Sequence, residues 1–211
     1  MRSLSQFLGW QFLRQLRYGR PIIVVSGLPR SGTSMMMQML QAGGLEILTD
    51  AVRTPDDSNP KGYLELEAVK NLDKGPPPAW LADARGKAVK VVSSLVTWLP
   101  GTYTYQVIFM RRNLEEVIVS QNTMLLARGT QPDQSQDQHV RAVYGKHVDD
   151  TLRVLRGRPW ISTLEVDYAE TVRNPRATAE RVTRFLGQPL DVDRMAAAID
   201  PALHRNRGTA G

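Results

Sequence analysis

Two glycines five residues apart lie in a polar turn between an apolar run and a methionine-rich segment. The run is PIIVVS, residues 21–26, and the turn is GLPRSGTS, residues 27–34. A glycine-rich turn that joins a buried strand to the N-terminus of a helix presents backbone N–H groups to an anion such as phosphate. ATP-binding loops carry a lysine directly after the second glycine, and here Thr33 occupies that position. The turn therefore predicts an anion site that differs from the site that grips the end of ATP.

The side chains of the turn add to this expectation. Arg30 supplies a positive charge two residues before the second glycine, and the hydroxyl groups of Ser31, Thr33 and Ser34 are further donors. A guanidinium and several hydroxyls suit the oxygen atoms of a phosphate or sulfate group. A tight turn that only opens a helix is the alternative interpretation of this stretch.

A second pair of residues has the spacing of an anion site. In VIFMRRNLEEVIVSQ, residues 107–121, an apolar run ends at Arg111 and Arg112, and Asn113 has the side chain of a helix N-cap. Ser120 follows Arg112 by eight residues, about two helical turns into the helix. Both side chains could face one ligand group. Taken singly, each is an ordinary polar residue at a strand end or on a helix.

These stretches together resemble the sulfotransferase family that uses 3′-phosphoadenosine 5′-phosphosulfate (PAPS), in its bacterial type. The turn contains RSGTS, similar to the family's [KR]-S-G-T-[ST] loop. The stretch RNLEEVIVS is similar to the family's R-[ND]-P-x5-S element, with leucine in place of proline. A third stretch, VDYAETVRNPRATAERVTRFLG, is similar to a family segment that begins with a tyrosine and ends in FLG. The resemblance extends from residue 21 to about residue 187.

The resemblance implies a role for each matching residue. The loop would hold the 5′-phosphosulfate, and Arg30 would also stabilise the charge that grows on the departing phosphate. Arg112 and Ser120 would hold the 3′-phosphate, and Tyr168 would lie near the adenine. PAPS is the expected co-substrate, and no metal ion is expected. The residues predicted to bind it are Arg30, Ser31, Gly32, Thr33, Ser34, Arg112, Ser120 and Tyr168.

The general base is predicted from the same resemblance. Cytosolic members use a histidine, and the corresponding stretch VKVVSSLVTWLP has none. Protein-tyrosine and some bacterial sulfotransferases use a glutamate downstream of the loop, and NPKGYLELE is similar to the NPKGYFE of bacterial relatives. Glu65 is therefore the predicted base, with Glu67 or Asp57 as substitutes. A solvated helix charge is the alternative for Glu65, and Lys90 is expected near the sulfuryl group.

Several other basic side chains have two interpretations. His139 and His147 fall on a predicted helix over 138–156, where exposure to solvent is favoured over a place in the acceptor cleft. Arg205 and Arg207 lie in RNRG, which is faintly similar to the basic loop that ends the family's cofactor site. A frayed basic tail is the alternative for these two arginines.

The predicted elements alternate between strands and helices. This alternation predicts an α/β, P-loop-type three-layer fold, with a central parallel sheet flanked by helices. Ligands of such folds gather at the carboxyl ends of the strands, where the turn after residue 26 falls. The predicted strands cover residues 21–26, 45–48, 87–94, 104–112 and 159–168, and the predicted helices cover 33–42, 63–72, 113–127, 138–156 and 174–187.

Length and composition restrict the remaining possibilities. The chain has 211 residues, which fits an N-terminal amphipathic helix over 1–20 and a single domain over 21–211. The net charge is +6, and 21 of the 27 basic residues are arginine, which favours an anionic ligand. The absence of cysteine excludes disulfides, a thiol nucleophile and cysteine zinc sites. No apolar run reaches the length of a membrane span or a signal peptide, so a cytoplasmic location is expected.

The predicted function is transfer of a sulfuryl group from PAPS to a hydroxyl or amine. The acceptor is expected to be a small molecule, sugar, peptide or lipid headgroup, and no nucleic-acid partner is expected. Residues 1–20 are expected to pack on the domain, and contact with a membrane surface is the alternative. An atypical P-loop kinase and a non-catalytic nucleotide-binding domain on the same fold are the two other functions that these residues allow.

Overall fold

A parallel sheet of four strands forms the centre of the molecule. The structure, a computed structural model, describes residues 19–50 and 64–199, so residues 1–18 of the predicted N-terminal helix lie outside the described part. The strands are β1 (Ile22–Gly27), β2 (Ala88–Lys90), β3 (Tyr105–Arg111) and β4 (Ile161–Asp167), in the order β2-β1-β3-β4. Every neighbouring pair is parallel, which confirms the predicted α/β fold.

The inner strands are buried on both faces because helices cover both sides of the sheet. Along β1, Ile22 and Val24 point into one hydrophobic core, whereas Ile23 and Val25 point into the other. All six residues of β1 are buried. This explains why β1 reads as an uninterrupted apolar run rather than as an alternation of apolar and polar residues.

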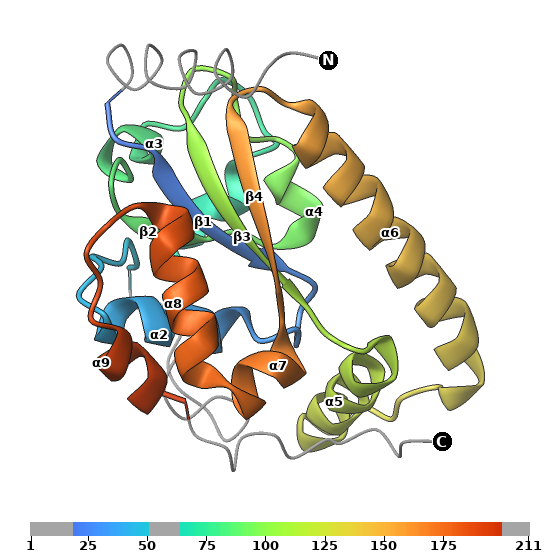
Figure 1. Ribbon diagram of the computed structural model, residues 1–211. Helices are drawn as coiled ribbons and strands as arrows, with labels where there is room; N and C mark the ends of the chain where they lie inside the picture. Colours follow the sequence, from blue (N-terminus) through green and yellow to red (C-terminus); the bar gives the residue numbers. More distant parts are fainter. Residues whose placement is uncertain (1–18, 51–63, 200–211) are drawn as a thin grey trace.

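The helices form the two outer layers (Figure 1). One layer consists of α2, α7, α8 and α9, which pack against the face of the sheet that carries Ile23 and Val25. The other layer contains η1, α3, α4 and α6. Helix α5 lies beyond the carboxyl ends of the strands and packs on α6. The bounds are α2 (Thr33–Ala42), η1 (Glu67–Asn71), α3 (Trp80–Asp83), α4 (Ser93–Val96), α5 (Leu114–Ala127), η2 (Gln134–Gln136), α6 (Asp137–Gly157), α7 (Tyr168–Arg173), α8 (Pro175–Leu186) and α9 (Val192–Ala197).

Three predicted elements differ from the structure. The strand predicted over 87–94 is shortened to β2, because Ser93 and Ser94 begin α4. Residues 45–48 make a single bridge, Ile47 to Ala88, and not a strand, because β2 itself has only three residues and offers no longer ladder. The helix predicted over 63–72 is reduced, within the described residues, to the short 3-10 helix η1. Residues 64–66 instead lie beside the segment that ends at Asp50. The Glu65 carbonyl oxygen accepts hydrogen bonds from the Asp50 backbone N–H and from the Thr49 hydroxyl.

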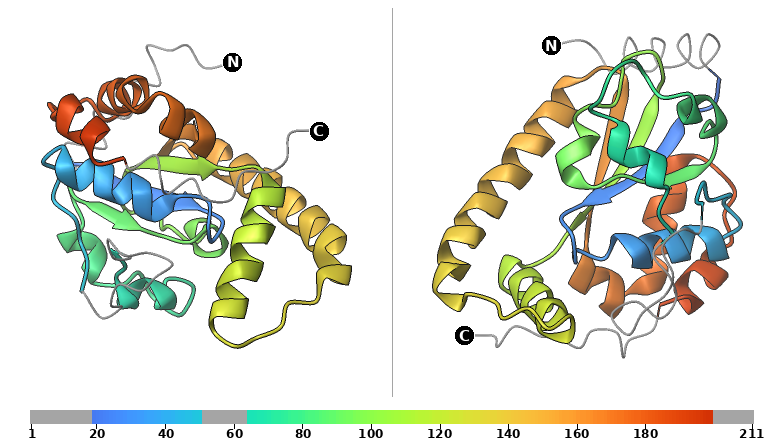
Figure 2. Two further views of the ribbon diagram at one scale, coloured as in Figure 1. Left: turned by 90° about the horizontal axis from the view of Figure 1, so that it is seen from below. Right: turned by 180° about the vertical axis from the view of Figure 1, so that it is seen from behind.

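Because all four strands are parallel, their carboxyl ends meet at one edge of the sheet. Gly27 ends β1, Lys90 ends β2, Arg111 ends β3 and Asp167 ends β4. Figure 2 shows the turns that follow these residues at this edge, together with α5. The fold therefore brings the loop, Lys90, the Arg112 segment and Tyr168 to the same end of the molecule.

No helix within the described residues is long and apolar enough to cross a membrane.

The close approach of β1 to β3 makes Gly27 sensitive to substitution. Its φ is +152°, and a Cβ at this position would lie 2.8 Å from the carbonyl oxygen of Met110, which is held in the sheet. We expect Gly27→Ala to lower the free energy of unfolding by about 2 kcal/mol, the usual size of such backbone strain. Gly157→Ala is the matched control, because nothing lies within 4 Å of the added methyl group. Urea unfolding of both variants measures the difference, and equal midpoints would contradict the prediction.

Candidate active site

The turn between β1 and α2 has an unusual backbone conformation. Arg30 has a φ of +70° and Gly32 a φ of +97°, so two of its residues are left-handed. The Leu28 carbonyl oxygen accepts hydrogen bonds from the Ser31 backbone N–H, at 3.1 Å, and from the Ser31 hydroxyl, at 2.7 Å. Ser31 is thus part of the internal framework of the turn, with 1% of its surface exposed.

The turn ends at the N-terminus of α2, which has the features of an anion site. The residue before the helix is Gly32, no side chain caps the first N–H groups, and the first turn contains no acidic residue. Helix α5 is different, since the side chain of Asn113 caps it and Glu115 and Glu116 lie in its first turn. The positive end of the α2 dipole is therefore not offset by a carboxylate in its own first turn.

Arg30 lies in a cluster with the second predicted subsite. Its Nε donates to the Ser120 hydroxyl at 2.9 Å, and its carbonyl oxygen accepts from Arg112 Nη1 at 3.0 Å. Ser120 is 2% exposed and comes from α5. Residues separated by 90 and 82 positions in the chain thus meet at one point. The predicted 5′ and 3′ subsites are adjacent, and the side chain of Arg30 lies toward the second of them.

Tyr168 packs directly beneath the turn. Its ring centroid is 4.1 Å from the Arg112 guanidinium carbon, and only 5% of the residue is exposed. A Cβ at Gly32 would lie 2.5 Å from Cδ2 of this ring, so only glycine fits there. Tyr168 therefore supports the conformation of the turn through Gly32. Its contact with adenine stays a prediction.

A second cluster lies at the start of α2. Lys90 Nζ donates to the Ser34 hydroxyl and to Glu65 Oε1, each at 3.0 Å. The Lys90 side chain is 13% exposed and the Glu65 side chain 33% exposed. The sequence predicted all three residues near the reacting group, and the structure brings them together. Lys90 is a fixed positive charge at the end of β2, beside a carboxylate that solvent can reach.

Glu67, one of the two alternatives to Glu65, does not lie in this cluster. Glu67 is in η1, where its exposed side chain forms an ion pair with Lys70 at 2.7 Å. Asp57, like Arg205 and Arg207, lies outside the described residues. The Glu65 backbone carbonyl accepts a hydrogen bond from the Thr49 hydroxyl at 2.7 Å, which links this residue to the segment that ends at Asp50. Of Glu65 and Glu67, the two of these acids that the structure describes, Glu65 is the one that contacts Lys90.

The two histidines on α6 have different surroundings. His139 is exposed, as expected. His147 is only half-exposed, and its Nε2 is 2.9 Å from the hydroxyl of Ser93, a buried residue at the start of α4. His147 is thus less exposed than the favoured interpretation expected, because α4 packs against α6 at this point.

One residue of the site has no counterpart among the predicted site residues. Glu116 Oε2 accepts from Arg112 Nε at 2.9 Å, and the two side chains are 11% and 7% exposed. The two residues are four positions apart, and Arg112 directly precedes the helix that carries Glu116. An acid four residues from the predicted anion-binding arginine was the sequence signal for this pair.

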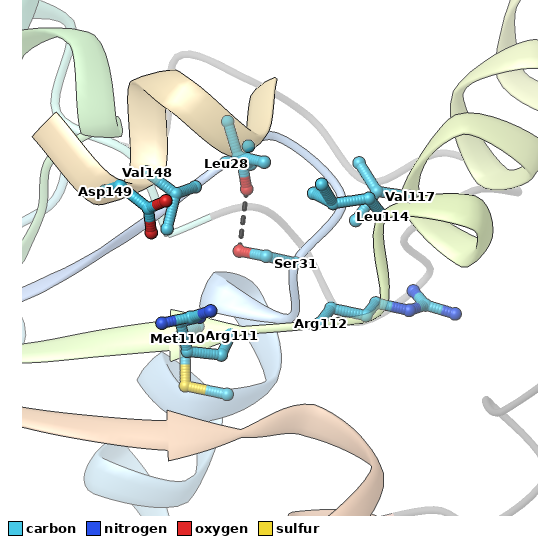
Figure 3. A pocket seen from close by; sticks show the side chains of 10 residues that line it. Leu28, Ser31, Met110, Arg111, Arg112, Leu114, Val117, Val148 and Asp149 are labelled. Carbon is cyan, nitrogen blue, oxygen red and sulfur yellow. Dashed lines mark hydrogen bonds between the residues drawn. The ribbon is translucent and has the colours of Figure 1, made fainter. Parts of the chain in front are cut away.

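A cavity of about 160 Å³ lies beside the turn on the α6 side (Figure 3). In Figure 3 the Ser31 hydroxyl points to the Leu28 carbonyl, and the Arg112 side chain extends away from the strand end toward α5. The lining is mixed: apolar side chains of the turn and of α5 and α6 surround it together with charged residues at the end of β3. It comprises Leu28, Ser31, Met110, Arg111, Arg112, Leu114, Val117, Gly145, Val148 and Asp149.

The central parallel sheet, the two helical layers and the glycine-containing turn after β1 define a P-loop-type three-layer fold. The family model described as "Sulfotransferase domain" matches residues 20–203, which is most of the chain. The chain belongs to this family, and the predicted membership is confirmed. A search of curated protein sequences gives no match.

Two solved structures have the same fold. The sulfotransferase domain from the Synechococcus PCC 7002 olefin synthase is 19% identical, with a TM-score of 0.51 over 91% of this chain and 90% of that one. The sulfotransferase domain from the curacin biosynthetic pathway is 14% identical, with a TM-score of 0.52 over 91% of this chain and 93% of that one. At these identities the likeness concerns the fold.

The burial of Tyr168 predicts a pH dependence of stability. Burial raises the pKa of its hydroxyl above the usual 10.0, and the positive charge of Arg112 offsets only part of that rise. A raised pKa in the folded state means that stability is complete below pH 10 and is lost as the pH rises through the folded-state value. We expect the wild-type chain to lose stability relative to Tyr168→Phe above pH 10. Urea unfolding at several pH values measures this difference, and parallel curves for the two proteins would contradict it.

Proposed function

We propose that this member of the sulfotransferase family transfers a sulfuryl group from PAPS to a hydroxyl or amine acceptor. One observation carries the proposal: Lys90 lies at hydrogen-bonding distance from both Ser34, in the first turn of α2, and the carboxylate of Glu65. A cation, an anion-binding helix terminus and an accessible carboxylate are the groups that such a transfer requires at one point.

The residues of the turn fit the phosphosulfate end of the donor. Backbone N–H groups at an uncapped helix start bind phosphate-type oxygens. Because Gly27 and Gly32 have no Cβ, the backbone of the turn can approach the neighbouring residues closely. Thr33 and Ser34 add hydroxyl donors, and Arg30 adds charge. This end of the donor has no β- and γ-phosphates, so a lysine in place of Thr33 would have no partner there.

The cluster of Arg112, Ser120 and Arg30 fits the 3′-phosphate. The Arg30 guanidinium donates to the Ser120 hydroxyl at 2.9 Å, and the Arg112 guanidinium donates to the Arg30 backbone carbonyl at 3.0 Å. The positive charges that both arginines bring to this cluster favour a phosphate dianion as its ligand. In this proposal Arg112 and Ser120 hold the 3′-phosphate, and Arg30 lies between the two anionic ends of the donor.

The proposed step is an in-line displacement at sulfur. The acceptor oxygen or nitrogen forms a bond to sulfur, the bond from sulfur to the bridging oxygen breaks, and its electron pair leaves with the 5′-phosphate. Glu65 accepts the proton that the acceptor loses. Lys90 and the N-terminus of α2 stabilise negative charge on the sulfuryl group and the departing phosphate. The products are the sulfated acceptor and adenosine 3′,5′-bisphosphate (3′,5′-ADP).

Glu65 is suited to act as the base because it is both held in place and accessible. Lys90 fixes its carboxylate, while 33% of its side chain is open to solvent and hence to an acceptor. The acceptor class follows from this chemistry and includes small molecules, sugars, peptides and lipid headgroups that carry a nucleophilic hydroxyl or amine.

Magnesium-dependent phosphoryl transfer is the second candidate reaction, and the turn disfavours it. P-loop kinases hold the β- and γ-phosphates with the lysine that follows the second glycine, and Thr33 stands there. Among the described residues, no group of three or more His, Asp or Glu side chains is close enough to hold a metal ion. Independence from metal stays a prediction that the binding experiment below tests.

Nucleotide binding distinguishes the candidate functions. We expect 3′,5′-ADP to bind with or without magnesium, and to bind at least tenfold more tightly than AMP, because charge-assisted hydrogen bonds to a second phosphate contribute about that much. Isothermal titration of the full chain with 3′,5′-ADP, AMP, ADP and ATP, each with and without magnesium, measures this. A preference for ATP with magnesium would favour a kinase, and failure to bind any of them would exclude PAPS as the donor.

The role of Glu65 is tested by removing its charge while keeping its shape. We expect Glu65→Gln to lower kcat by about 10²–10⁴-fold, the usual contribution of a general base. Transfer is measured as release of 3′,5′-ADP from PAPS with a panel of hydroxyl and amine acceptors. Glu67→Gln, which changes an exposed carboxylate two residues away, is the control and should keep wild-type kcat. Equal activity of both variants would remove Glu65 from the mechanism and favour another base, or a binding domain if neither protein turns over.

A further inference from the structure

Arg112 is held from three directions in the structure. Its Nε donates to Glu116, its Nη1 donates to the carbonyl oxygen of Arg30, and the Tyr168 ring covers one face of the guanidinium at 4.1 Å. With 7% of its side chain exposed, Arg112 has little freedom to rotate. A planar guanidinium fixed at two of its donors also has a fixed direction for the remaining ones.

The carboxylate of Glu116 is unexpected at this place. A site for a phosphate dianion gains from positive charge, and a nearby carboxylate opposes the ligand by electrostatic repulsion. Glu116 is nevertheless 11% exposed and directly paired with the arginine that the proposed donor would contact. Its neighbour Glu115 is in the same helical turn, is half-exposed and pairs with Arg141 instead. In the first turn of α5 the Glu115 carboxylate therefore faces solvent, whereas the Glu116 carboxylate contacts Arg112.

We propose that Glu116 is a positioning residue that sets the direction of Arg112 and thereby gives the site its selectivity for a nucleotide with a 3′-phosphate. This inference rests on the proposed function. The ion pair of Nε with Glu116 and the bond from Nη1 to the Arg30 carbonyl together fix the plane of the Arg112 guanidinium. The gain in alignment outweighs the repulsion, because a buried arginine without this partner would turn toward other acceptors.

The same arrangement links the two anionic subsites. Arg112 Nη1 supports the carbonyl of Arg30, a non-glycine residue whose φ of +70° needs support from its surroundings. Glu116 thus acts on the turn through Arg112. A loss of Glu116 would mainly weaken binding of the 3′-phosphate and, to a smaller extent, the turn itself.

Two substitutions separate positioning from charge. Glu116→Gln and Glu116→Ala remove the same negative charge, but only glutamine keeps an oxygen that accepts from Arg112 Nε. Glu115→Ala removes a carboxylate from the same helical turn without touching Arg112, and is the matched control. The measurement is the ratio of the affinities for 3′,5′-ADP and AMP, by isothermal titration of the full chain, because a general loss of folded protein lowers both affinities and leaves their ratio unchanged.

We expect Glu116→Ala to lower this ratio about tenfold relative to Glu116→Gln, the size of one well-aligned charge-assisted hydrogen bond. Glu116→Gln and Glu115→Ala should keep or exceed the wild-type ratio. An equal ratio in the alanine and glutamine variants, or an equal fall in Glu115→Ala, would overturn the positioning role alone. A wild-type chain that binds neither nucleotide, or binds both equally, would overturn the proposed donor and this inference with it.

Discussion

The turn from β1 into α2 is confined between the end of β3 and the ring of Tyr168, and the whole site depends on this confinement. A side chain at Gly27 would collide with the Met110 carbonyl, and one at Gly32 with Tyr168. The turn therefore follows one narrow path, with Arg30 and Gly32 in left-handed conformations. That path directs the uncapped start of α2 to the edge of the sheet where the strands end.

The charges of the site form two ion pairs with different accessibility. Lys90 pairs with Glu65, whose side chain is 33% exposed, whereas Arg112 pairs with Glu116, whose side chain is 11% exposed. An incoming acceptor can reach the more exposed carboxylate of Glu65, whereas the carboxylate of Glu116 is enclosed with Arg112. The proposed roles of a base for Glu65 and a positioning residue for Glu116 follow from this difference in burial.

Parts of the fold and site could be predicted because they depend on local sequence. The uninterrupted apolar runs predicted β1 and β3, since inner strands of a parallel sheet are buried on both faces. Asn113 predicted the start of α5, and its side chain does accept from the Glu115 N–H. Where a segment's conformation depends on a distant partner, prediction was wrong: residues 45–48 make one bridge to Ala88, and residues 64–66 pair with the segment that ends at Asp50.

The sequence by itself determined the kind of site, because a glycine-rich turn between a buried strand and a helix, and an arginine at the end of a strand, act through their own backbone and charge. Only the tertiary structure decided the partners within it. In the folded chain Lys90 pairs with Glu65, whereas Glu67 pairs with Lys70. The Arg30 side chain donates to Ser120, and Glu116 is enclosed with Arg112. These choices depend on strand order and on contacts between residues up to 90 positions apart. Such contacts exist only after the sheet has assembled, so no local pattern of residues encodes them.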